Sequence, residues 1–312
     1  MKTTKLSTIA ILSLALFACQ DFNGLDSTTS ETDELVLKSA VIAETDLMVE
    51  SVSDEVVYEA EFFAESEKLL KQLARFKGGK NLLSGHKGNR YLNGYAPDVS
   101  IDTAATGYPV TITINYGVGS ELKNGRKISG LVTIEISAPR GTDGATRLIT
   151  YTNCVIDSVN INGTAIETFN GDNETARTIN NNSEVTFILP DGTVIERTGT
   201  HTRNWIEGLS TPLEHDDDVI EITGSLTATT STGNTWERGI IEPLLRTGDC
   251  RHHVQGVIEF SQNGEVISTL DFGDGTCDNL ALLTVEGETV EIELKGRAPK
   301  ANVDKYRSKG KK

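Results

Sequence analysis

Several chemical signatures are missing from this chain of 312 residues. It has no Gly-x-Ser-x-Gly, His-Glu-x-x-His or paired Cys-x-x-Cys motif, so nothing in it marks a serine hydrolase or a zinc enzyme. Only two tryptophans are present, which leaves little material for an aromatic binding platform. Basic residues number 29 against 45 acidic ones, and the net charge of −16 argues against nucleic acid as a partner.

Long apolar runs are absent except at the N-terminus. Lys2 and Lys5 precede an apolar stretch over 6–15 that is too short to span a bilayer. The stretch ends in Leu16-Phe17-Ala18-Cys19, which resembles the lipobox of bacterial lipoproteins. We therefore expect residues 1–18 to be a signal peptide and Cys19 to carry acyl chains such as palmitate, which would anchor the protein at the outer membrane. The alternative is an ordinary secretory signal whose cleavage site ends in cysteine.

Charge is unevenly distributed after the signal. Residues 20–67 contain fourteen acidic residues and the single base Lys38, whereas 68–90 contain seven basic residues and no acidic one. The composition of 19–52 predicts an acidic, flexible tether.

An amphipathic helix is predicted over 53–77, with Ser53 as its N-cap and a glycine pair as its stop. Its apolar stripe consists of Tyr58, Phe62, Leu69, Leu73 and Phe76. We expect this stripe to dock on the rest of the protein; the alternative is adhesion of the basic half of the helix to a membrane surface.

Period-two alternation dominates the rest of the chain and predicts an antiparallel β domain over 91–299, followed by a basic tail over 300–312. The predicted strands are 110–114, 131–136, 147–151, 184–189, 193–197, 219–230, 235–245, 255–260, 266–272, 280–285 and 289–294. The predicted fold is mainly β, an extended antiparallel meander that is sandwich-like or an open barrel, preceded by one amphipathic helix.

Turn signals punctuate these runs. The dipeptides are Asn124-Gly125, Asn162-Gly163, Asp191-Gly192, Asn263-Gly264 and Glu286-Gly287. Each is typical of a tight hairpin connection between paired strands.

Four cysteines agree with an exported protein. Cys250 and Cys277 flank one predicted hairpin and are the favoured disulfide pair, since disulfides persist in oxidising compartments. Cys154 lies in an apolar context and is expected to be a buried small hydrophobe, with a nucleophilic role as the alternative.

A family resemblance rests on motifs spread over 110–294. They are Ile114 to Gly117, Asp191 to Thr193, Asp217 to Val219, Ile222 to Ser225, and Leu270 to Asn279. In this order they resemble a family of uncharacterised β-rich lipoproteins from Bacteroidetes. The resemblance implies an envelope location and a β-rich body, periplasmic or surface-exposed, and it implies no catalytic residue.

Two clusters could bind a metal. Asp271, Asp274 and Asp278 share a glycine-rich loop and offer the oxygen ligands that Ca²⁺ prefers, although the bland interpretation is a structural turn. A zinc site is the second hypothesis, and its candidate ligands are His252 and His253 beside Cys250, together with His201, His215 and Asp216 to Asp218.

The aromatic residues Trp205, Trp236, Tyr108 and Tyr116 could line a glycan or peptide groove, but filling of the sheet core is the favoured interpretation. The function expected from the whole sequence is a noncatalytic binding or structural role at the cell envelope. Its partners would be the membrane, through the lipid, and a glycan or envelope protein. The alternative is a secreted hydrolase or metal-dependent enzyme acting on extracellular polymers.

Overall fold

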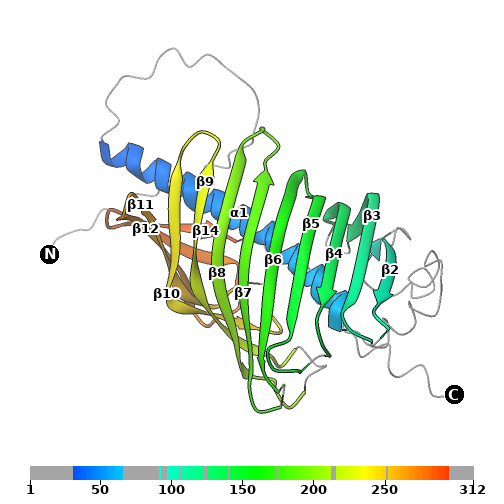
Figure 1. Ribbon diagram of the computed structural model, residues 1–312. Coiled ribbons are helices and arrows are strands. Elements are labelled where there is room, and N and C mark those ends of the chain that lie inside the picture. Colours follow the sequence, from blue (N-terminus) through cyan, green and yellow to red (C-terminus); the bar gives the residue numbers. More distant parts are fainter. Residues whose placement is uncertain are drawn as a thin grey trace.

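The computed structural model describes one helix and fourteen strands (Figure 1). The described residues are 31–65, 91–92, 97–105, 107–122, 125–139, 141–172, 174–211, 216–250 and 252–294. The predicted signal peptide, Cys19, part 66–77 of the predicted helix and the basic tail 300–312 lie outside them. Among the described residues, no helix combines the length and the apolar composition that crossing a membrane requires.

The strands follow one another along the chain with short connections. They are β1 (Tyr91–Leu92), β2 (Asp98–Thr103), β3 (Val110–Leu122), β4 (Lys127–Ile136), β5 (Thr146–Ile156), β6 (Val159–Gly171), β7 (Arg177–Ile188), β8 (Val194–Glu207), β9 (Val219–Thr230), β10 (Thr235–Thr247), β11 (Gln255–Gln262), β12 (Glu265–Asp274), β13 (Leu280–Val285) and β14 (Glu288–Glu293).

All strands belong to one antiparallel sheet. From β3 to β14 each strand pairs with the next in sequence, while β1 and β2 both pair with β3. The predicted mainly β meander is confirmed. The sheet is single, continuous and open, and it is not divided into the two packed sheets of a sandwich.

Three of the predicted turn dipeptides connect neighbouring strands: Asp191-Gly192, Asn263-Gly264 and Glu286-Gly287. Of the dipeptide Asn124-Gly125, the described residue Gly125 lies between β3 and β4. The turn at Asn162-Gly163 is wrong, because both residues lie inside β6. Gly163 has a φ of 133° there, and a Cβ on it would meet the carbonyl oxygen of Glu184 on β7 at 2.2 Å. The missing side chain at this position lets the two strands approach each other closely.

The helix α1 (Glu31–Glu65) begins 22 residues before the predicted start. The tether interpretation of 19–52 is therefore wrong from Glu31 onward, and Ser53 lies within the helix instead of capping it. Ile42, Val49 and Val52 recur at helical spacing and are buried. Their burial against the sheet stabilises this acidic segment, since each fully buried side chain of this size contributes about 1.5–3 kcal/mol.

The sheet curls around α1 (Figure 1). The helix contacts β4 as well as β12 and β13, so strands far apart in the sheet lie on either side of it. Its buried apolar side chains, ending with Phe63, join one core with the inward side chains of the sheet. Docking of the predicted stripe stays a prediction, because the side chains of Tyr58 and Phe62 and the residues beyond 65 lie outside what the structure describes.

Candidate functional site

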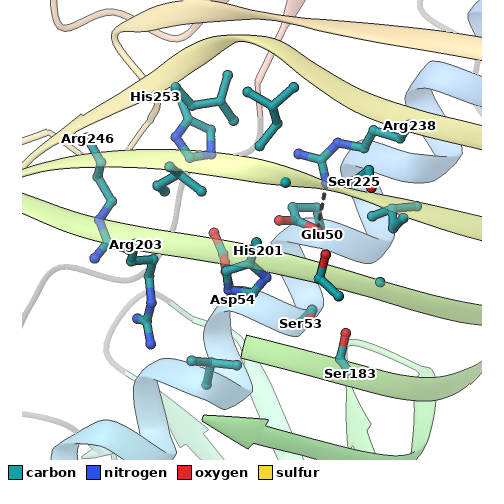
Figure 2. A pocket seen from close by; sticks show the side chains of 18 of the residues that line it. Glu50, Ser53, Asp54, Ser183, His201, Arg203, Ser225, Arg238, Arg246 and His253 are labelled. Atoms are coloured by element: carbon teal, nitrogen blue, oxygen red, sulfur yellow. Dashed lines mark ion pairs between the residues drawn. The ribbon is translucent and has the colours of Figure 1, made fainter. Parts of the chain in front are cut away.

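A cavity of about 340 Å³ lies between α1 and strands β7 to β10 (Figure 2). The helix contributes Glu50, Ser53, Asp54, Val57 and Glu61, which follow one another at spacings of one, three or four residues. Such spacing places side chains on one face of a helix, so this wall is largely acidic. The volume lies at the lower end of the range of about 300–1,000 Å³ typical of small-molecule pockets.

The opposite wall is formed by inward positions of the sheet. Because alternate residues of a strand share a face, Arg197, Gly199, His201 and Arg203 of β8 all line the cavity. Arg238 and Arg246 of β10 line it as well. This wall is therefore basic where the helix wall is acidic.

Apolar side chains fill the spaces between these charges. They are Val185, Phe187, Ile222, Leu226, Ile240 and Leu244 on the sheet and Val57 on the helix. Two carboxylates at the mouth, Asp216 and Asp249, are exposed.

The acidic and basic walls are joined by ion pairs. Glu50 accepts from Arg197 and lies 3.2 Å from Nη1 of Arg238, an ion pair drawn in Figure 2. Burial would raise the pKa of Glu50, but the two guanidinium groups outweigh it and hold this pKa well below its ordinary value. Glu50 therefore stays ionised at neutral pH.

Glu61, further along the same face of the helix, is also kept ionised by arginines. It accepts from Arg203, which also donates to Glu167 of β6. Burial would raise the pKa of Glu61, but Arg203, Arg246 and Arg147 together hold it well below its ordinary value.

His201 lies between these two pairs. Burial first, and then the neighbouring Arg203, lower the pKa of its imidazole to about 4. The ring is therefore uncharged at neutral pH, and only one of its nitrogens carries a proton.

Further polar contacts secure the helix outside the cavity. Oη of Tyr116 donates to Glu59 at 2.8 Å, and Arg126 lies 3.7 Å from Glu55 while donating to the carbonyl oxygen of Ser51 at 2.9 Å. These acids of α1 point toward the sheet, so its acidic composition is part of the interior of the protein.

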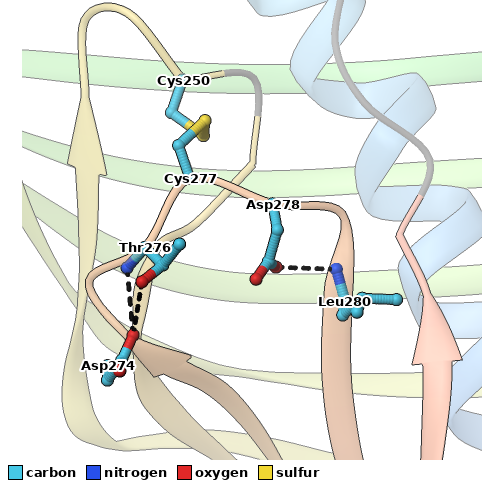
Figure 3. Close-up of a disulfide and its surroundings, with 6 residues drawn as sticks. All are labelled: Cys250, Asp274, Thr276, Cys277, Asp278 and Leu280. Atoms are coloured by element: carbon cyan, nitrogen blue, oxygen red, sulfur yellow. Dashed lines mark hydrogen bonds between the residues drawn. A yellow bond between two sulfur atoms is a disulfide. The ribbon is translucent and has the colours of Figure 1, made fainter.

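Cys250 and Cys277 are joined in a disulfide, the pair that the sequence favours (Figure 3). Their Cα atoms are 5.7 Å apart, and the bond closes the base of the hairpin formed by β11 and β12. Cys154 is a buried free thiol, and its pKa is raised to about 12, first by burial and then by Glu59. A thiol in this state is a poor nucleophile.

Each of the three aspartates of the calcium hypothesis accepts hydrogen bonds within its own turn. Asp271 accepts from the amide of Gly273 at 2.8 Å, Asp278 accepts from that of Leu280 at 3.0 Å, and Asp274 accepts from the hydroxyl and amide of Thr276 (Figure 3). The hydroxyl and amide of Thr276 hold the pKa of Asp274 below its ordinary value. This geometry is that of structural turns.

The candidate zinc ligands are partly brought together. His201 and His253 both line the cavity, and the ring of His253 packs edge-on against Phe272 with centroids 5.2 Å apart. Cys250, however, is bonded to Cys277 in the disulfide, and His215 lies outside the described residues. In the part of the chain that is described, no three His, Cys, Asp or Glu side chains are grouped to hold a metal ion.

The aromatic residues fill the interior, as the favoured interpretation predicted. Trp205, Trp236 and Tyr116 are at most 6 % exposed, and Tyr108 packs against the core. The guanidinium of Arg177 lies 3.9 Å from the ring centre of Trp205. An aromatic groove built from these side chains is therefore wrong.

The arginines of the cavity are the functional residues that sequence reasoning missed. A signal was present: Arg197 and Arg203 share the parity of the inward Ile195 and Trp205 along β8. An arginine at an inward position of a half-buried strand needs a buried partner, and acids were available on α1.

No family model, curated protein or solved structure matches this chain.

Proposed function

We propose that this protein is a noncatalytic binding protein of the bacterial cell envelope, held at the outer membrane by acyl chains on Cys19. Its ligand site is the cavity between α1 and β7 to β10. The observation that carries the proposal is this cavity of about 340 Å³, in which Glu50 and Glu61 of the helix are paired with arginines of the opposite wall. Small-molecule sites are commonly preformed pockets in which polar groups fix the orientation of the ligand.

The electrostatics support binding over the hydrolase alternative. Hydrolysis by a carboxyl pair needs one carboxyl whose pKa is raised, so that it can donate a proton near neutral pH. The pKa values of Glu50 and Glu61 are shifted in the opposite direction. His201, with a pKa of about 4, would be a weak general base.

The envelope location is supported by two independent features. One is the lipobox-like end of the N-terminal apolar stretch at Cys19. The other is the disulfide between Cys250 and Cys277, because such bonds persist in oxidising compartments.

The binding site is tested by blocking the cavity. Ser183 lines the cavity from β7 and pairs in register with Gly199 of β8. Because Gly199 has no side chain, the phenylalanine ring of Ser183→Phe would fill the space beside it. The wild type and the variant are each purified in the native state and then denatured. Mass spectrometry compares the small molecules that they release. We expect a near-stoichiometric compound from the wild type and its loss from Ser183→Phe.

The matched control is Ser100→Phe, on an exposed serine of the edge strand β2. It should retain the compound. Equal recovery from both variants would exclude this cavity as the site, and a compound recovered in chemically altered form would contradict a noncatalytic role.

The anchor is tested separately with Cys19→Ala. Cells fed a radiolabelled fatty acid should label the wild-type protein and not the variant, and the variant should leave the membrane fraction. Undiminished label in Cys19→Ala would refute lipidation at this residue.

A further inference from the structure

We infer that the ligand of this cavity is a neutral sugar of one or two rings, free or at the end of a glycan. The inference rests on the proposed function, because it names the chemistry of the ligand that the same cavity takes. Three features carry it: the pairing of the charges, the hydrogen-bonding groups that the pairing leaves over, and the apolar side chains beside them.

Charge pairing disfavours a charged ligand. Glu50 is paired with Arg197 and Arg238, and Glu61 with Arg203, while Asp54 and Arg246 have interactions of their own. Between the two walls, an anion would have to take an arginine from its carboxylate, and a cation would have to take Glu50 or Glu61 from its arginine. The exposed Asp216 and Asp249 add negative charge to the lining and disfavour an anion further. Breaking a buried ion pair is strongly unfavourable because it leaves one charge without its partner. A neutral ligand leaves every pair intact.

Hydrogen-bonding capacity remains after the pairs have formed. His201 lines the cavity, and its uncharged imidazole has one donor and one acceptor nitrogen. Ionised carboxylates such as Glu50 and Glu61 accept several hydrogen bonds each, more than their arginines use. Serine hydroxyls line the same space, and Ser53, Ser183 and Ser225 lie to one side of His201 in Figure 2.

A sugar hydroxyl matches this mixture because it donates and accepts at the same time. One hydroxyl can accept from a serine or from the imidazole of His201 and donate to a carboxylate of the helix. A site that hydrogen-bonds a ligand hydroxyl in this way prefers ligands that carry the matching group.

Apolar side chains complete the match. Val57 on the helix and Ile222 and Leu226 on β9 line the cavity together with the charged groups. A sugar ring presents C–H groups on its faces and hydroxyls around its edge, so it can bury the former against these side chains. The volume of about 340 Å³ restricts the ligand to one or two rings.

The test is a calorimetric titration of the purified soluble protein with matched sets of sugars. One set is glucose, glucuronic acid and glucosamine; the other is galactose, galacturonic acid and galactosamine. Within a set the ring is shared and the charge is zero, negative or positive. Oligosaccharides of two to six units, compared with the free sugars, distinguish a free ligand from the end of a glycan.

We expect at least one neutral sugar to bind, and its acidic and basic counterparts to bind at least tenfold more weakly. Ser183→Phe should lose at least tenfold in affinity, while Ser100→Phe should keep it. The comparison among sugars uses the wild-type protein alone, so it decides the question even where a variant does not fold.

Equal or tighter binding of a charged sugar would overturn the inference, and so would the failure of every sugar in the panel. Either result leaves the proposed function standing if the wild type still releases a compound that Ser183→Phe does not. The absence of any released compound and of any binding would refute both.

Discussion

Replacement of Glu50 by glutamine tests whether the ion pairs between α1 and the sheet hold the helix in place. Glu50 accepts from Arg197 and lies 3.2 Å from Arg238, two arginines whose side chains are 9 % and 7 % exposed. Glutamine keeps the shape and can accept a hydrogen bond, but it removes the charge that both guanidinium groups face. The substitution leaves two buried guanidinium groups without the charge of Glu50. Arg238 keeps one acidic neighbour, Asp46, which lies 3.5 Å from its Nε.

Removal of one partner from a buried pair costs about 3–5 kcal/mol. The side chain of Glu50 is 27 % exposed, so water screens part of its interaction. We therefore expect Glu50→Gln to lower the free energy of unfolding by about 3 kcal/mol at pH 7, the lower end of that range.

The pH dependence has a defined sign. The pKa of Glu50 is lowered in the folded protein, while the unfolded chain takes up the proton near pH 4.5. The stability that its charge contributes is therefore complete well above pH 4.5 and is lost as the pH falls toward the folded pKa, by about 1.4 kcal/mol per unit. The difference between wild type and Glu50→Gln should shrink from about 3 kcal/mol at pH 7 to about 1 kcal/mol at pH 3.

Urea unfolding followed by circular dichroism at both pH values measures this difference. Glu44→Gln, on an exposed glutamate of the same helix, is the matched control and should change the stability by less than about 0.5 kcal/mol. A loss below about 0.5 kcal/mol for Glu50→Gln at pH 7, or a difference that grows on acidification, would refute the reasoning.

Three further predictions concern the core and the cysteines. Phe63→Ala should lower the free energy of unfolding by about 3–5 kcal/mol, because Phe63 is 0 % exposed and joins α1 to the core; a cost under 1 kcal/mol in urea unfolding would show that the helix does not pack there. Replacement of Cys250 and Cys277 by serine should cost about 3.5 kcal/mol, from the entropy of a loop spanning 27 residues, and an unchanged melting temperature would contradict this. Cys154 should resist a thiol reagent at pH 8 in the native protein and react only after unfolding, since burial raises its pKa to about 12; labelling at the same rate in both states would disprove its burial.

Most of the sheet could be predicted from sequence because strand alternation is a local property. The runs around Val110 and Glu184 show period two within a few residues, and short turns make their neighbours antiparallel. The strand β6 escaped prediction because Asn162-Gly163 is a turn signal by composition. Its glycine instead lets β6 approach Glu184 of β7, a requirement that only the paired strand reveals.

The start of α1 escaped prediction for a different reason. The acidic composition of 31–52 indicates exposure to solvent, yet Asp46 is 1 % exposed. Further along the helix, Glu55 and Glu59 are buried as well. The arginine that neutralises Glu50 lies 147 residues away in sequence. No local pattern contains such a pair, so the cavity that these partners line could not be located either.

The corrected helix start changes what the N-terminal segment can do. The sequence predicts an acidic, flexible tether over 19–52, but only eleven residues separate Cys19 from the first residue of α1. A chain of this length spans at most about 40 Å when fully extended. With acyl chains on Cys19, as we propose, the N-terminal end of α1 is confined to that distance from the bilayer. Because α1 also forms one wall of the cavity, the proposed anchor restrains an element of the proposed binding site.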